Sequence, residues 1–193
     1  IVNNISQCGD HIIRLTEETG KDLHLGLEPE PLGWFETTDE TVKFFDRLRS
    51  CKGNVYDSVI GVNYDTCHLA IEFESAADAV AALRDNNIRI SKLHLSSALR
   101  LSPSPQSLKI LKDYEDDVYL HQVVAKTKEG TLQRYRDLSD ALKYAMSGTE
   151  CDDEEWRVHF HIPLHSSPGN QFNDTRDHIE DILELLSSDP SLC

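Results

Sequence analysis

No apolar run in this sequence approaches the ~18 residues needed to cross a bilayer, and no signal peptide is visible at its start. A C-x-x-C pair is also missing, because the five cysteines are scattered along the chain. An odd number of scattered cysteines is typical of reduced thiols in a cytosol-like compartment. These absences predict a cytoplasmic protein without a membrane span.

Basic residues are in short supply. The chain has 19 Lys and Arg residues against 34 Asp and Glu residues, which gives a net charge of −15. Nucleic-acid binding depends on contacts between basic side chains and phosphate, so this balance argues against a nucleic-acid partner. It fits a small-molecule metabolite as the partner and leaves the oligomeric state open. A hydrophobic content of 39% is enough for a real core.

Apolar segments with strand character alternate with segments of helical periodicity. We expect helices over residues 1–20, from Thr37 onward, over Ser75–Asn87, over 106–113, over Asp137–Ser147 with Gly148 as its end, and over Asn173–Ser187. We expect strands over Leu23–Glu28, Val59–Asp65, Ile88–Leu95 and Trp156–Ile162, and a hairpin made of Val118–Lys126 and Thr131–Arg136. Thr37 and Glu40 match a capping box at the start of the second helix.

Four strand–helix repeats with one inserted hairpin predict an α/β fold with βα units around a parallel sheet. An open doubly wound sheet is the alternative, but no strand is followed by a G-x-G-x-x-G phosphate turn. We therefore predict a partial (β/α)8 TIM barrel, since four strands are too few to close one. Residues 1–193 would form a single domain, a fragment that lacks the N-terminal strands and the last strand of the barrel.

Catalytic groups in such barrels lie at the carboxyl ends of the strands. Glu28 ends the first strand, and Asp65 ends the second with His68 one turn further on. A carboxylate and an imidazole at this spacing are good ligands for a divalent metal such as Zn, Mn or Mg. In the alternative interpretation, Glu28 belongs to an exposed acidic turn, Asp65 caps the next turn and His68 lies on the surface.

The third and fourth strands add histidines. His94 alternates with two leucines, and His159 and His161 share one face of the strand Trp156–Ile162. One strand can therefore present two imidazoles to one metal or one substrate. The alternatives are a hydrogen-bonded structural role for His94 and an exposed polar face for the other two.

Three further residues are candidates for substrate binding. Arg100 follows the third strand and could hold a phosphate or carboxylate, although it could instead pair with the acidic surface. His121 lies on the expected hairpin and could reach over the pocket or remain at its rim. Trp34 could form an apolar wall for a substrate ring or serve in packing.

In order along the chain, Glu28, Asp65, His68 and His94 resemble the ligand series of the xylose isomerase-like barrel superfamily of sugar isomerases, epimerases and endonuclease-IV-type repair enzymes. Residues 65–68, Asp-Thr-Cys-His, look especially like the endonuclease-IV motif. That motif continues with Asp-x-His, where this chain has His159-Phe160-His161. The resemblance implies a metal held by Glu28, Asp65, His68, His94 and His161, with no counterpart here for a last-strand Glu.

The chain also resembles the metabolite-traffic protein E family of the Ebo gene cluster (EboE-like) across nearly all of its length. The stretches that carry this resemblance are Leu25–Pro31, Glu36–Thr41, Tyr64–Ala70, Glu72–Glu74, Leu95–Leu101, Tyr119–Val123 and Trp156–Leu164. This resemblance implies a role in the handling or export of a metabolite.

Three functions follow from these patterns. The first is a metal-dependent sugar isomerase or epimerase, in which Glu28 moves a proton and His161 joins it as a catalytic group, with Arg100, His121, His159 and Trp34 binding the substrate. The second is a non-catalytic protein that binds or carries a metabolite. The third is an endonuclease-IV-like phosphodiesterase, which the net charge of −15 disfavours.

Overall fold

The computed structural model describes residues 1–147, 152–169 and 171–192. Its first part is a three-stranded parallel sheet in the order β1-β2-β3. The strands are β1 (Leu25–Leu27), β2 (Ile60–Asp65) and β3 (Ile90–His94). All six residues of the central strand β2 are buried, which is expected for a parallel strand covered on both faces.

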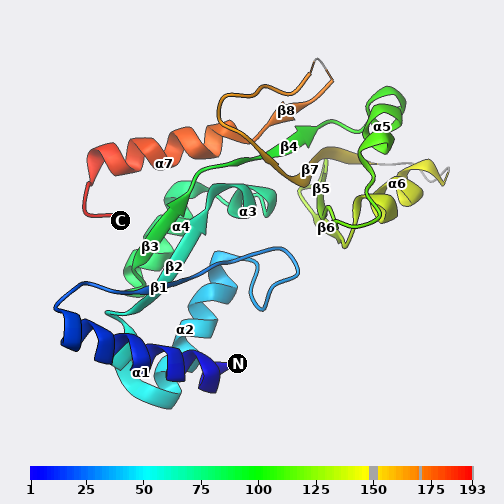
Figure 1. Cartoon of the computed structure of the whole chain (residues 1–193). Helices are drawn as coiled ribbons and strands as arrows, with labels where there is room; N and C mark the ends of the chain where they lie inside the picture. The colour runs from blue at the N-terminus through cyan, green and yellow to red at the C-terminus, as the bar shows by residue number, and fades with distance from the viewer. Residues whose placement is uncertain (148–151, 170, 193) are drawn as a thin grey trace.

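Helices cover one face of this sheet (Figure 1). They are α1 (Val2–Thr19), α2 (Thr38–Lys52), α4 (Ala76–Asp85) and α7 (Arg176–Ser188), with a short 3-10 turn at Gly53–Tyr56. Phe44, Phe45 and Leu48 of α2 pack in the same core as the β2 side chains. The capping box predicted at Thr37 and Glu40 is present and starts α2. None of the helices in the described residues is long and apolar enough to cross a membrane.

Successive side chains of β2 point to opposite faces of the sheet, and only one of these faces packs against the helices. Ile60, Val62 and Tyr64 join the apolar core with the helices. Asn63 and Asp65 lie on the other face, and both are buried. The Asp65 carboxylate is therefore presented at the end of a fully buried strand, on the side away from the helical layer.

A second sheet has five strands in the order β6-β5-β7-β4-β8, and all its pairs are antiparallel. The strands are β4 (Ser97–Leu101), β5 (Val123–Thr127), β6 (Leu132–Tyr135), β7 (Asp153–Ile162) and β8 (Asn173–Asp174). The helices α5 (Pro105–Leu111) and α6 (Leu138–Met146) and the 3-10 turn Lys112–Tyr114 accompany it. Trp156 and Val158, both fully buried, lie in its apolar core.

The predicted partial TIM barrel is wrong. β7, which contains the predicted strand Trp156–Ile162, runs antiparallel between β5 and β4 and is not a fourth parallel strand. The prediction also missed β4, which follows β3 after only two residues (Figure 1). A parallel neighbour needs a crossover connection of about a dozen residues, so β4 could not extend the barrel. In the part of the chain that the structure describes, the two sheets form no closed barrel, so the predicted xylose isomerase-like barrel fold is not present.

The predicted hairpin is present as β5 and β6, but it is not an insertion, because β5 pairs with β7 as part of the second sheet. The helix predicted over Asp137–Ser147 is α6, and its predicted end, Gly148, lies outside the described residues. The short helix α3 (Thr66–Ile71) begins directly after β2 and packs against β4 and β7 of the second sheet. It places the Asp-Thr-Cys-His motif at the seam between the two sheets.

Candidate metal centre

The site begins with Asp65, whose side chain is fully buried. Its Oδ1 atom accepts hydrogen bonds from the backbone N–H groups of Cys67 (2.7 Å) and His68 (3.3 Å). Asp65 is thus the N-cap of α3, as the alternative interpretation of the sequence proposed. The cap uses only one of the two carboxylate oxygens, so it holds the carboxylate in place and leaves Oδ2 for another partner.

His68 lies on α3 and is 3% exposed. Its Nδ1 atom is 3.0 Å from the carbonyl oxygen of Pro29, which can only accept, so Nδ1 carries the proton and donates. The second ring nitrogen, Nε2, therefore presents a lone pair. Histidine ligands of metals are commonly oriented by this kind of bond from the far side of the ring.

Glu28 follows β1, and its carboxylate oxygens contact two side chains. Oε2 accepts a hydrogen bond from Asn63 Nδ2 at 2.6 Å, and Oε1 lies 3.4 Å from His68 Nδ1. The side chain is 33% exposed, so the carboxylate lies at the edge of the site. No sequence signal pointed to Asn63, which lies on the same face of β2 as Asp65, away from the helices.

His94 ends β3 and lies beside Asp65, which it opposes in the parallel register. Its Nδ1 atom is 2.6 Å from Asp65 Oδ2, and its side chain is 45% exposed. Even so, Oδ2 is buried and makes no hydrogen bond of acceptable geometry within the described residues. The Asp65 carboxylate and the His94 ring are thus in direct contact, and together with His161 they form one of the groups that could hold a metal ion.

The second sheet supplies His159 and His161, both from β7. His159 Nδ1 lies 2.6 Å from the side-chain oxygen of Gln122, to which it donates. His161 Nδ1 lies 2.7 Å from Ser96 Oγ, in the short link between β3 and β4. Gln122 and Ser96 thus fix the two rings from behind. The sequence had suggested only that Gln122, next to His121, could reach over the pocket, and it had given Ser96 no role.

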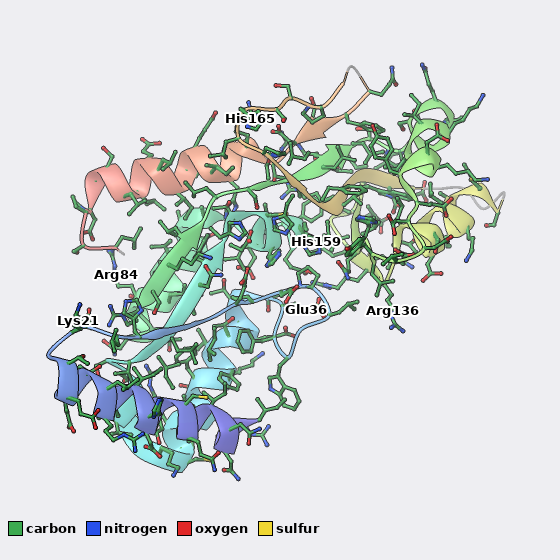
Figure 2. All side chains as sticks on the ribbon, in the orientation of Figure 1. Lys21, Glu36, Arg84, Arg136, His159 and His165 are labelled. Carbon is green, nitrogen blue, oxygen red and sulfur yellow. The ribbon has the colours of Figure 1, made fainter. Side chains whose placement is uncertain are left out.

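The Nε2 atoms of three histidines converge. His161 Nε2 is 3.3 Å from His68 Nε2 and 3.0 Å from His159 Nε2. Two nitrogens that each lie ~2.0–2.1 Å from a tetrahedral zinc ion are roughly 3.3 Å apart. The spacing therefore fits imidazoles around one ion. Figure 2 shows His159 between the two sheets.

Burial favours the neutral form of two of these imidazoles, His159 and His161. It lowers the pKa of His159 to about 3, helped by the neighbouring His68 and His161. It also lowers the pKa of His161, against the opposing effect of Asp65. Neutral imidazole is the form that binds metal, so the environment prepares both rings as ligands over the physiological pH range.

Three overlapping groups in the described residues could hold an ion, each with its ligand atoms within 4.8 Å of one another. They are Glu28 with Asp65 and His68, Asp65 with His94 and His161, and Cys67 with His159 and His161. Cys67 was not predicted as a ligand. Burial raises the pKa of its thiol well above the ordinary value, and Sγ lies 3.6 Å from the carbonyl oxygen of Phe160. Its thiol is therefore protonated while no cation is present.

The predicted substrate-binding residues are more dispersed. Arg100 Nη1 donates to Asp177 of α7 at 2.8 Å, as the alternative interpretation had it. The ring of His121 packs against Phe160 with centroids 4.2 Å apart, on the strand that carries His159 and His161. Trp34 is 62% exposed, in the loop after β1. The structure thus brings together all five predicted metal ligands and His159.

Comparison with family models, curated proteins and solved structures gives no match to this chain.

Proposed function

We propose that this chain builds a divalent-metal centre that binds a small oxygen-bearing metabolite and supports proton transfer on it, as isomerases and epimerases do. The observation that carries this proposal is the buried carboxylate of Asp65, whose Oδ2 lies 2.6 Å from His94 Nδ1 and makes no hydrogen bond of acceptable geometry within the described residues. The same Oδ2 atom lies 3.9 Å from His68 Nε2, the lone-pair nitrogen that faces His161. A divalent cation bound between these atoms would compensate the charge of a carboxylate that is removed from water.

The donor set favours zinc. Four imidazoles and two carboxylates meet in the site. Imidazole ligands suit zinc and the other late transition metals, whereas magnesium prefers oxygen ligands and keeps several waters. We therefore expect affinity to fall from Zn²⁺ to Mn²⁺ to Mg²⁺.

The residues have separable roles in this proposal. A bound divalent metal would polarise a carbonyl or hydroxyl oxygen of the substrate. Glu28 lies at the edge of the site with its orientation fixed by Asn63, so we assign it the movement of the proton on the adjacent carbon. His161 lies at the more open side of the cluster, backed by Ser96, and would orient a substrate oxygen.

A second candidate is a protein that binds a metabolite at the metal without turnover. The geometry of Glu28 favours it, because both carboxylate oxygens already face protein groups, Asn63 and His68. A general base needs an oxygen within hydrogen-bond reach of the substrate proton. In the first candidate, substrate binding must therefore displace one of these contacts.

Metal content and solvent exchange test the two candidates. We expect the purified protein to take up about one zinc ion or more per chain, and in D2O to place deuterium on the carbon next to the carbonyl of a small hydroxyketone or hydroxyaldehyde. Glu28→Gln should abolish this exchange and keep the metal, and Glu17→Gln on the exposed face of α1 is the matched control. Failure to bind any divalent metal would refute both candidates. Metal binding without exchange on any probe would favour the binding protein.

A further inference from the structure

Three polar residues lie next to the metal cluster at one edge of the second sheet, two of them one position outside β5 and β6. Val123 of β5 is paired with Tyr135 of β6 on one side and with Val158 of β7 on the other. One position along, Gln122 therefore lies between Arg136 and His159, and the backbone N–H of His159 donates to the carbonyl of Gln122 at 2.9 Å. Residues opposite each other in antiparallel strands share a face, so these three residues form a row that leads from Arg136 to the metal cluster.

A cavity of about 220 Å³ opens beside this row. Its polar wall consists of Glu36, Glu72, Gln122, Arg134 and Arg136. At ~30 Å³ for each water molecule, the space equals roughly seven waters, which suits a metabolite of a few carbon atoms. Figure 2 shows Glu36 and Arg136 on the same side of the molecule as His159.

One carboxylate oxygen in the wall of this cavity lacks a hydrogen-bond partner in the described residues. Glu72 is 3% exposed, and its Oε2 accepts from Arg134 Nε at 2.8 Å and also from Arg134 Nη2. Its Oε1 is buried and has no partner in the described part of the chain. A buried unsatisfied oxygen calls for a donor, and a ligand hydroxyl or amine would supply one.

The donors of the wall point to an acceptor-rich ligand. The amide oxygen of Gln122 already accepts from His159, so its two N–H groups remain as donors to the cavity. Arg136 is exposed, and no ion pair of its guanidinium is found within the residues that the structure describes. A free guanidinium beside amide N–H groups matches the geometry of a carboxylate or a phosphate.

We propose that this cavity is the anion subsite of the metal centre, where Arg136 and the Gln122 amide hold the carboxylate or phosphate of a small hydroxylated metabolite. This inference rests on the proposed function, because the other oxygens of the same molecule would reach the metal. Neighbouring strands are ~4.8 Å apart, so Arg136 and His159 are separated by roughly 10 Å of backbone, which two side chains and a short ligand can span. The subsite takes the role that the sequence had suggested for Arg100, whose guanidinium is paired with Asp177.

Calorimetric titration of the zinc-loaded protein tests the inference with three probes: dihydroxyacetone, dihydroxyacetone phosphate and glycerate. We expect at least one of the two anions to bind ten times or more as tightly as neutral dihydroxyacetone. Which one does so identifies phosphate or carboxylate as the preferred group. Arg136→Gln should weaken the binding of the preferred anion by about tenfold or more, since a charge-assisted hydrogen bond is lost.

Arg47→Gln on α2 is the matched control, because it removes the same charge from an exposed position on another element, and it should leave all three affinities within about twofold. Equal binding of the neutral and anionic probes would overturn the inference, as would equal binding by the two arginine variants. In both cases a normal zinc content would leave the proposed function intact. A protein that takes up no metal would refute the proposed function, and the subsite with it.

Discussion

The parallel sheet and the antiparallel sheet meet at the site with unlike ligands. From the parallel side come Glu28, Asp65 and His94, at or just after the ends of adjacent strands. From the antiparallel side come only imidazoles, His159 and His161, two residues apart on one strand. Helix α3 adds His68 between them.

This difference has a physical consequence. Carboxylates at the carboxyl edge of a parallel sheet supply charge, and here one of them is fully buried. The imidazoles supply lone pairs and are kept neutral by burial. Two of the three possible ligand groups include His161 of the second sheet, whereas Glu28, Asp65 and His68 form a group without it, so the two halves can be compared by substitution. Substitutions in the two halves should therefore lower metal affinity by different amounts.

Asp65→Asn should have the largest effect. The amide keeps the shape of the side chain and the cap of α3, but it removes the buried charge. We expect metal affinity to fall at least ~100-fold, because the cation loses a charged ligand that is buried away from water. Calorimetric zinc titration measures it. Asp46→Asn, exposed on α2, is the control, and unchanged affinity in Asp65→Asn would place the ion elsewhere.

His161→Ala should weaken metal binding more than His94→Ala. His161 belongs to two of the possible ligand groups and faces both His68 and His159, whereas His94 belongs to one and is 45% exposed. We expect a loss of ~100-fold against ~10-fold, since a well-held ligand contributes more. The same titration compares them. A larger loss in His94→Ala would mean that ligands from the parallel sheet contribute more to metal affinity than those from the antiparallel sheet.

Acid should destabilise the metal-free protein through His178, which lies outside the site. His178 on α7 is buried, and its Nε2 lies 3.0 Å from the hydroxyl oxygen of Tyr64 of β2. Burial lowers its pKa to about 4, with Arg157 acting in the same direction. Between about pH 6.5 and 4 the unfolded chain binds the proton and the folded chain does not, so stability falls as pH falls.

At pH 5 this group alone should lower the free energy of unfolding by about 2 kcal/mol relative to neutral pH. Urea unfolding at pH 7 and pH 5 measures the change. His178→Gln should flatten the slope, and His11→Gln, exposed on α1, should leave it as it is. An identical slope in both variants would assign the acid sensitivity to other groups.

Gln122→Ala should have the smallest effect. It removes the acceptor that fixes the proton of His159 on Nδ1, without removing a ligand. Loss of such an orienting bond typically costs about tenfold or more in metal affinity, and we expect the lower end because His68 and His161 remain. Gln133→Ala, exposed on β6, is the control for the zinc titration. A loss as large as that of His161→Ala would make Gln122 more than an orienting residue.

Local patterns predicted the parallel half of the molecule well. The capping box at Thr37, the strand ending at Asp65 and the helix beginning after Ser75 depend on neighbours in sequence, and all are present. Register and direction in the antiparallel half depend on pairings between residues 97–101 and 156–162. Hydrophobic alternation reveals which residues share a face but not which way a strand runs, so a parallel barrel was the wrong inference.

The same limit applies to the site. Glu28, Asp65, His68, His94 and His161 could be named because each stands at or near a strand end with metal-binding chemistry. Ser96, Asn63 and Cys67 carried no such signal, since each is an ordinary polar or small residue until a distant ring or carboxylate approaches it. Arg136 likewise becomes a candidate only when the register places it beside Gln122.

The sequence by itself determined the chemistry that is available: an acidic chain, a carboxylate at the end of a buried strand, and histidines spaced to share a face. The tertiary structure decided how these groups meet. A two-residue link joins β3 to β4. β4 pairs with β7 in the antiparallel direction, and this pairing brings His159 and His161 close to Asp65. Such a contact between residues about a hundred positions apart depends on backbone pairing and packing, which no local pattern encodes.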